Sequence, residues 1–210
     1  MEANRWPPLP RAFFERDTVR VARELLGHYL VREYEGHILA GRIVETEAYV
    51  GLDDKASHAS VGRTSRNAVM FGPAGYAYVY LIYGVHHCLN VVTEEEGYPA
   101  AVLIRALEPV EGVEIMRRLR GRRPDVELTN GPGKLCQALA IDLRFNGHDL
   151  CRGEQLWIAR GESVPPEHIV SGPRVGVRGD RRALTVPWRF AVRNHPYVSR
   201  PYPWKKGTSS

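Results

Sequence analysis

Near the start of the chain, apolar residues recur at the spacing of one helix face. Asp17 precedes this stripe and Gly27 follows it. Aspartate is a preferred N-cap residue, and glycine commonly follows the last residue of a helix. We therefore predict a short structural helix between these two residues. Its apolar stripe consists of Val21, Ala22, Leu25 and Leu26.

Four later segments have the apolar or β-branched character of sheet strands. Two of them span residues 38–49 and 100–107, and glycine or proline bounds them. Between them, residues 77–83 and 85–92 flank Gly84. Two such runs on either side of a glycine are typical of a β-hairpin. We predict a hairpin with its tip near Tyr83 and Gly84, and this tip is unusually apolar.

Two more helices are predicted from turn residues and charge. The first is expected to start near Pro109, with Glu111 and Glu114 in its opening turns. Acidic residues at the start and basic residues at the end of a helix suit its dipole. The second is expected over residues 131–139, where Lys134 in the first turn opposes the dipole unless an anion binds. The basic end of the first helix contains Arg117, Arg118 and Arg120.

Helical and strand-like segments alternate without a clear linker or an internal repeat. The 210 residues fit one domain of ordinary size. We predict a single α+β domain over residues 1–210, with peripheral helices around a curved, mainly antiparallel β-sheet. The polar, proline-bearing ends at residues 1–10 and 204–210 are expected to be poorly ordered.

Composition and charge narrow the functional classes only a little. With 43% hydrophobic and 25% charged residues, the chain is typical of a globular protein and unlike a disordered or fibrous one. Lysine and arginine number 29 against 24 acidic residues, which gives a formal net charge of +5. This balance weakly favours an anionic partner such as nucleic acid.

The cysteines and the start of the chain indicate a reducing compartment. Cys88, Cys136 and Cys151 are widely spaced, so neither a disulfide framework nor a zinc finger is predicted. The first residues lack a secretory signal pattern. Residues 67–93 carry no charge, but their glycine, proline, histidine and asparagine residues argue against a membrane span. We expect a cytoplasmic protein that does not bind membranes.

Two carboxylates are the first candidates for chemistry. Glu45 and Glu47 are two apart on a predicted strand, so their side chains share one face about 7 Å apart, together with Tyr49. Burial of such a pair would raise a carboxyl pKa, as a general acid or base requires. The alternative is a pair that is solvated or neutralised by arginines. Arg105 is the only charge in an apolar run, so it needs an anionic partner if it is buried. It would either form a structural salt bridge with Glu45 or Glu47, or hold a catalytic carboxylate or a water.

Aromatic residues of the predicted hairpin are candidates for base contacts. Tyrosine side chains stack on bases or wedge between base pairs. Tyr78 is expected in the hydrophobic core. Tyr83 at the exposed tip has no core to pack against, which favours a functional role for it. His86 and Cys88 would share a strand face, but two ligands do not make a zinc site. Lys134 lies outside any complete phosphate-loop motif, because Leu135 stands where that motif needs serine or threonine.

Taken together, several motifs resemble the alkyladenine (methylpurine) DNA glycosylase family. Their order and approximate spacing match over nearly the whole chain. The matching segments are residues 41–51, His58, residues 78–84, residues 102–109, residues 131–139 and residues 174–177.

The resemblance implies a monofunctional DNA glycosylase of base excision repair. Such an enzyme binds duplex DNA through the minor groove, flips out an alkylated purine of the 3-methyladenine type and hydrolyses its N-glycosidic bond; hypoxanthine and ethenoadenine belong to the wider lesion range. By resemblance, Glu47 activates the water, and Arg105 orients it together with the backbone carbonyl at Val175. Glu45 is expected to be a structural partner. No metal or organic cofactor is implied.

The resemblance also assigns the contacts to DNA. The flipped base would lie between Tyr49 on one side and His58 and Tyr80 on the other, with Asn90 obstructing the amino group of guanine. The hairpin would protrude from the domain, and Tyr83 at its tip would fill the gap in the duplex. Lys134 would contact a phosphate or be structural. A monomer without an obligate protein partner suffices for this task, and bacterial members would be associated with the nucleoid. His86 and His87 depart from the bulky aromatics of vertebrate members.

Two other functions compete with this interpretation. A noncatalytic nucleic-acid-binding module would keep the basic surface, but it would not need Glu47 and Arg105 as buried charges. A glycoside hydrolase is suggested only by the spacing of Glu45 and Glu47, which could serve an inverting mechanism. That reading leaves the apolar hairpin tip unexplained.

Overall fold

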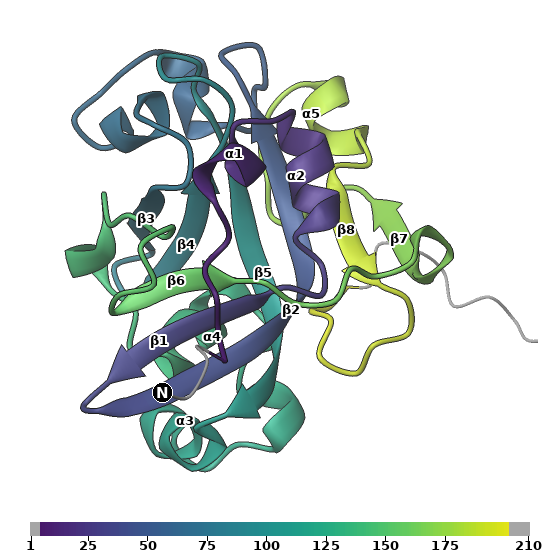
Figure 1. Cartoon of the computed structure of the whole chain (residues 1–210). Coiled ribbons are helices and arrows are strands. Elements are labelled where there is room, and N and C mark those ends of the chain that lie inside the picture. Colours follow the sequence, from purple (N-terminus) through teal and green to yellow (C-terminus); the bar gives the residue numbers. More distant parts are fainter. Residues whose placement is uncertain (1–4, 202–210) are drawn as a thin grey trace, which may run out of the picture.

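An eight-stranded sheet runs through the centre of the protein in the computed structural model, which describes residues 5–201 (Figure 1). The strands follow the order β3-β4-β5-β2-β1-β6, while β8 pairs with β2 and β7 pairs with β8. All of these pairs are antiparallel, so the predicted α+β fold with a mainly antiparallel sheet is confirmed. The strands are β1 (Tyr29–Tyr34), β2 (His37–Val50), β3 (Ala77–Ile82), β4 (His86–Val92), β5 (Ala100–Glu111), β6 (Leu156–Ala159), β7 (Ile169–Gly172) and β8 (Arg189–Val192).

The long strand β2 connects most of the sheet. One of its edges pairs with β5, and the other pairs first with β1 and then, from Glu45 to Glu47, with β8. Where β2 pairs with β5, Val44 of β2 and Arg105 of β5 have no partner residue on the other strand, so each forms a β-bulge. Such bulges bend a strand and re-aim its side chains. The two bulges therefore lie where the predicted catalytic residues meet.

Short helices surround this sheet. The helix α2 packs against β2 and β5, and α4 packs against β4 and β5. Asp17 caps α2 by accepting a hydrogen bond from the backbone N–H of Arg20 at 2.7 Å, as the sequence predicts. The predicted apolar stripe is buried in the main hydrophobic core. The helices are α1 (Arg11–Phe14), α2 (Thr18–Glu24), α3 (Val113–Arg120), α4 (Pro132–Ala138) and α5 (Arg181–Thr185).

The predicted start of the helix near Pro109 is wrong. Pro109 and Glu111 belong to β5, and α3 begins only at Val113. Proline is tolerated in this strand because the opposite edge of β5 pairs with β4 only at residues 101–103. Gly112 makes the turn between strand and helix: its φ is 71°, and a Cβ there would lie 2.4 Å from a methyl carbon of Leu39.

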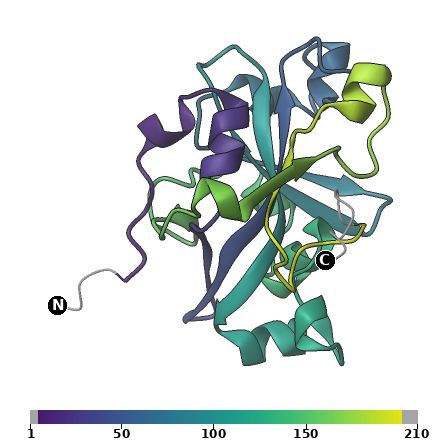
Figure 2. The ribbon, with the colours of Figure 1, turned by 90° about the vertical axis from the view of Figure 1, so that its right-hand side faces the viewer.

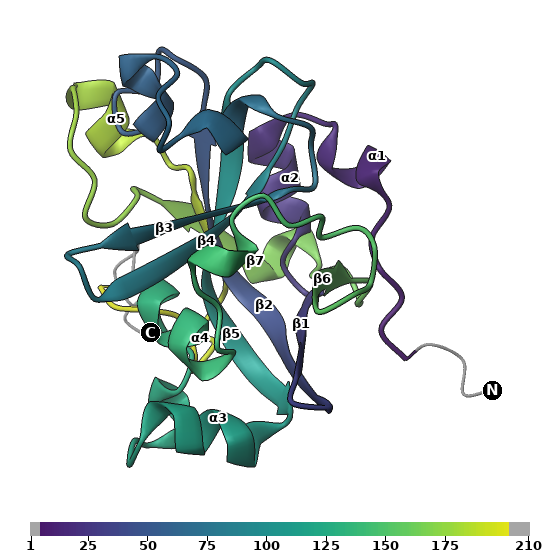
Figure 3. The same ribbon diagram turned by 90° about the vertical axis from the view of Figure 1, so that its left-hand side faces the viewer.

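Strands β3 and β4 form the predicted hairpin, which extends away from the rest of the sheet (Figures 2 and 3). The backbone N–H of Val85 bonds to the carbonyl of Ile82 at 3.2 Å and closes the turn. Tyr83 and Gly84 between them have φ values of 52° and 71°, the signs of a type I′ turn. Glycine adopts this conformation freely, whereas tyrosine does so at a cost. The tip presents Tyr83, 87% exposed, to its surroundings.

The N-terminal residues 5–10 pack against the rest of the domain. Pro8 forms an isolated β-bridge with Ala159, and Trp6 and Leu9 are buried. The backbone carbonyl of Trp6 accepts a hydrogen bond from Trp157 at 2.9 Å. Poor order of the chain ends stays a prediction, and residues 1–4 and 204–210 lie outside the described part of the chain. Within residues 5–201, no helix has the length and apolar character needed to cross a bilayer.

A buried ion pair attaches the segment after β7 to the end of β2. Both amino nitrogens of Arg174 donate to the carboxylate of Asp54, at 2.5 and 2.7 Å. Arg174 also donates to the backbone oxygens of Ala48 and Ala183, at 2.9 and 3.2 Å. Bidentate pairs of this kind are geometrically specific. This contact fixes the position of the next residue, Val175, relative to β2.

We expect Arg174→Leu to lower the free energy of unfolding by about 3–5 kcal/mol, because it leaves the carboxylate of Asp54 buried without its cation. The measurement is urea denaturation followed by circular dichroism. Arg144→Leu is the matched control, since Arg144 pairs with Asp142 at the surface. Its expected cost is below about 1 kcal/mol. Equal losses in both variants would contradict this assignment.

Candidate active site

A pocket of about 720 Å³ opens at the base of the hairpin. It is bounded by β2, β3 and β4, by the loop at residues 55–70 and by residues 175–178. Glu47 is fully buried, but it contacts three residues that line the pocket. The predicted site residues in the lining are Tyr49, His58, Tyr80, Tyr83, Asn90, Arg105 and Val175.

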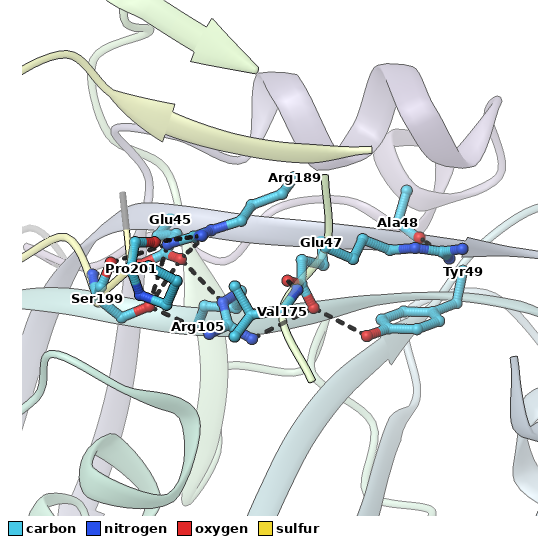
Figure 4. Close-up of polar contacts among 10 residues, drawn as sticks. Glu45, Glu47, Ala48, Tyr49, Arg105, Val175, Arg189, Ser199 and Pro201 are labelled. Carbon is cyan, nitrogen blue, oxygen red and sulfur yellow. Dashed lines mark hydrogen bonds and ion pairs between the residues drawn. The ribbon is translucent and has the colours of Figure 1, made fainter. Parts of the chain in front are cut away.

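Three different groups hold the carboxylate of Glu47 (Figure 4). The hydroxyl of Tyr49 donates to Oε2 at 2.8 Å, and the backbone N–H of Val175 donates to Oε1 at 2.7 Å. Nη1 of Arg105 lies 3.3 Å from Oε2. Burial, reinforced by the charge of Glu47, raises the pKa of Tyr49 well above its usual value, so the phenol keeps its proton and serves as donor. The carboxylate is therefore fixed in one orientation.

The sequence left open whether Arg105 pairs with Glu45 or with Glu47, and in the structure it contacts both. Its Nε donates to Oε1 of Glu45 at 2.8 Å, in addition to its contact with Glu47. Burial opposes the charged form of this arginine, but Glu47 and then Glu45 outweigh that effect and raise its pKa above the usual value. Arg105 is therefore a permanent cation at the wall of the pocket.

Glu45 has partners quite different from those of Glu47. Nε of Arg189 donates to Oε1 of Glu45 at 2.6 Å, and both the backbone N–H and the hydroxyl of Ser199 donate to this carboxylate, at 2.6 and 2.9 Å. Glu45 is not part of the pocket lining. Arg189 and Ser199 do not line the pocket either, and the structural role of Glu45 stays a prediction.

Further aromatic side chains line the pocket. The rings of His58 and Tyr80 meet edge to face with centroids 4.5 Å apart, and Nδ1 of His58 lies 2.9 Å from the hydroxyl oxygen of Tyr78. Burial and then the charge of Arg66 lower the pKa of His58, which favours its neutral form. Burial raises the pKa of Tyr78 to about 12, so that phenol is neutral as well.

The loop that carries His58 is held by a buried asparagine. Nδ2 of Asn67 donates to the backbone oxygens of His58 and Gly62, at 2.9 and 2.8 Å. The side chain of Asn90, itself buried, is fixed by a hydrogen bond from its Nδ2 to the backbone oxygen of Tyr78 at 3.0 Å. Tyr78 is 1% exposed and packs in a hydrophobic cluster, as predicted.

Lys134 lies outside the main pocket. Its Nζ donates to Oδ1 of Asn130 at 2.8 Å and is 4.0 Å from a carboxylate oxygen of Glu127. It lines a second cavity of about 470 Å³, and Arg105 and Pro132 line both cavities. A phosphate contact by Lys134 stays a prediction.

Sequence analysis missed Arg189 and Ser199. Arg189 is 1% exposed in the otherwise apolar strand β8, which is the same signal that identified Arg105. Ser199 carries no local signal, because its charged partners Arg105 and Glu45 are more than 90 residues away in the chain. The structure also shows a contact of Val175 that was not predicted. Its backbone N–H donates a hydrogen bond to Glu47, whereas the prediction concerned its backbone carbonyl.

The sequence predicts that His86 and Cys88 of the hairpin do not form a zinc site. Among the residues that the structure describes, no three histidine, cysteine, aspartate or glutamate side chains are grouped to hold a metal ion. Cys88 is buried and lines the pocket, and burial raises the pKa of its thiol.

Comparisons with known proteins agree on one family. The family model described as "Methylpurine-DNA glycosylase (MPG)" matches residues 12–196. A "Putative 3-methyladenine DNA glycosylase" of Carboxydothermus hydrogenoformans is 54% identical over 192 residues, which cover 91% of this chain and 98% of the relative. A protein with the same description from Methanocella arvoryzae is 54% identical over 198 residues, covering 94% and 98%.

These matches extend over almost the whole chain and include every element of the pocket. The family's activity is the hydrolysis of N-glycosyl bonds in DNA, in DNA repair. The chain therefore belongs to the methylpurine-DNA glycosylase family, and it is a DNA-binding repair enzyme of the 3-methyladenine glycosylase type.

Proposed function

We propose that this enzyme flips an alkylated purine of the 3-methyladenine type out of duplex DNA and hydrolyses its N-glycosidic bond with a water activated by Glu47. The observation that carries the proposal is the carboxylate of Glu47, which is held by Tyr49, Arg105 and Val175 behind an aromatic pocket. A pocket for an extruded base, with a fixed carboxylate just behind its lining residues, fits the needs of base excision.

In the proposed reaction, Glu47 takes a proton from water while the water oxygen bonds to C1′ of the sugar. The bond between C1′ and the purine nitrogen breaks, and its electron pair goes to the base. A cationic methylated purine then leaves as a neutral molecule. The negative charge of Glu47 also stabilises the positive charge that develops on the sugar. Arg105, with the backbone carbonyl at Val175, orients the water.

The aromatic pocket supports binding of a cationic base. Tyr49 would stack on one face of the base, with His58 and Tyr80 on the other, and stacking contributes about 1–3 kcal/mol per base. Electron-rich rings favour a positively charged partner. The neutral state of His58 suits such a base, since a charged imidazole would repel it. Asn90, held by the backbone of Tyr78, would obstruct the amino group of guanine.

The hairpin tip supports insertion into the duplex from the minor groove. Tyr83 is exposed at the tip and still borders the pocket, so it could fill the gap that the flipped nucleotide leaves. The net charge of +5 favours contact with phosphates, and Lys134 is a candidate for one of them. Each pocket needs only one side chain to fill the gap in the duplex, so a monomer is sufficient. Hypoxanthine and ethenoadenine are further proposed substrates.

Glu47→Gln is expected to lower the single-turnover rate of base release from a duplex with N3-methyladenine by about 10²–10⁴-fold, because the amide cannot accept the proton from water. Affinity for the lesion duplex should change little. Glu33→Gln, on the exposed face of β1, is the control and should keep the natural rate. Rapid release by Glu47→Gln would refute the role of this carboxylate, and no release by the natural protein despite tight binding would favour a noncatalytic module.

Tyr83→Ala is expected to weaken binding to a lesion duplex by about tenfold, since loss of one stacking ring costs about 1–3 kcal/mol. Binding to undamaged duplex should weaken much less. Fluorescence anisotropy with both duplexes measures the two affinities. Tyr83→Phe keeps the ring and should bind as the natural protein does. An equal loss on both duplexes would show that Tyr83 is not a wedge.

Falling pH is expected to weaken binding of a cationic base through protonation of His58. Because the pKa of His58 is lowered, the effect should appear only below the usual titration range of histidine. One unit charge close to the base costs about 1 kcal/mol, so affinity for cationic N3-methyladenine should fall about fivefold more than affinity for neutral hypoxanthine. The titrations use the Glu47→Gln variant, which prevents turnover. His58→Asn should remove the difference between the two bases, and a difference that persists would contradict this explanation.

A further inference from the structure

The last described residues form a strap over the buried charges of the active site. This C-terminal strap, residues 196–201, follows β8 and lies against β2 and β5 at Glu45 and Arg105 (Figure 4). Arg189 fastens it by donating to the backbone oxygens of Ser199 and Pro201, at 2.8 and 2.7 Å. Ser199 is 4% exposed, so the strap is packed at this point.

The hydroxyl of Ser199 uses its whole hydrogen-bonding capacity. It donates to Oε1 of Glu45 at 2.9 Å and accepts from Nη2 of Arg105 at 3.1 Å and from Nη2 of Arg189 at 3.4 Å. A serine hydroxyl has one hydrogen to donate and two lone pairs to accept. It therefore lies between two guanidinium groups that would otherwise repel each other.

These contacts determine the direction in which Arg105 points. A guanidinium group is planar, so fixing two of its nitrogens fixes the third. Glu45 holds Nε at 2.8 Å, Ser199 holds Nη2 at 3.1 Å, and Nη1 then lies 3.3 Å from the carboxylate of Glu47. Without the hydroxyl, Nη2 would lose this contact, and only the short bond to Glu45 and the longer ion pair with Glu47 would hold the group, so its plane could tilt about the Nε contact.

We propose that Ser199 is a positioning residue for base excision, whose hydroxyl aims the guanidinium of Arg105 at Glu47. The inference rests on the proposed function, in which Arg105 orients the water for Glu47. Ser199 touches neither the pocket nor the reacting atoms, since it lines only the second cavity, behind Arg105. Its effect on the reaction therefore passes through Arg105.

The test compares base release and DNA binding in variants of the full-length chain. Ser199→Ala is expected to lower the single-turnover rate on an N3-methyladenine duplex about tenfold, because misorientation of a catalytic group costs rate. Affinity for the same duplex should change less than about twofold, since the stacking residues are untouched. Ser199→Thr keeps the hydroxyl and should restore most of the rate.

A control separates positioning from loss of stability. Thr18→Val removes another buried hydroxyl, which bonds to Thr93 and Glu94 far from the pocket, and it should keep the natural rate. Thermal unfolding of each variant measures stability directly. A natural rate in Ser199→Ala would overturn the proposal. So would equal slowing in Thr18→Val, or a rate in Ser199→Thr as low as in Ser199→Ala at equal stability.

Two further measurements complete the design. If Ser199→Ala does not fold, Ser199→Cys keeps a side chain of similar size with a weaker donor and acceptor, and it should show the same slow release with retained affinity. A natural rate in that variant would overturn the proposal.

Glu47→Gln in the same assay tests the proposed function separately. Activity in Glu47→Gln refutes the role of Glu47. An inactive Glu47→Gln together with a fully active Ser199→Ala refutes only the role of Ser199.

Discussion

Four charged side chains neutralise one another inside the sheet, and the geometry of the active site depends on this balance. Glu45 and Glu47 contribute two negative charges from β2, while Arg105 and Arg189 contribute two positive charges from β5 and β8. Burial of any of them without a partner would cost several kcal/mol. The strands must therefore meet in the arrangement that pairs all four. The bulges at Val44 and Arg105 make this arrangement possible.

The two glutamates of this cluster have different surroundings, although they lie only two residues apart on β2. Glu45 contacts both arginines and the C-terminal strap, so its carboxylate is fully used in holding the structure together. Glu47 has one arginine, one phenol and one backbone N–H, and all three come from residues at the pocket wall. A carboxylate next to the pocket can act on a bound molecule, whereas one behind Arg105 can only position its neighbours.

The structure separates the rigid and the exposed parts of the site. The charged cluster and the aromatic wall lie on sheet strands and on a loop that Asn67 holds, where they are fixed by buried hydrogen bonds. The hairpin of β3 and β4 projects from the sheet (Figure 3). Tyr83 lies in its turn, in a backbone conformation that is costly for tyrosine. A fixed pocket beside an exposed ring suits the proposed function, in which the enzyme first contacts a duplex and then holds one base still.

Sequence alone determined the local elements and the family. The cap at Asp17, the hairpin around Gly84 and the alternation that puts Glu45, Glu47 and Tyr49 on one face follow from backbone geometry and short-range patterns. Only the tertiary structure decided that β5 continues through Pro109, since this depends on which strand edges are paired. It also decided which partners each of the two glutamates has, because Arg105, Arg189 and Ser199 are distant from them in sequence and meet them only when β2, β5, β8 and the strap bury their charges together.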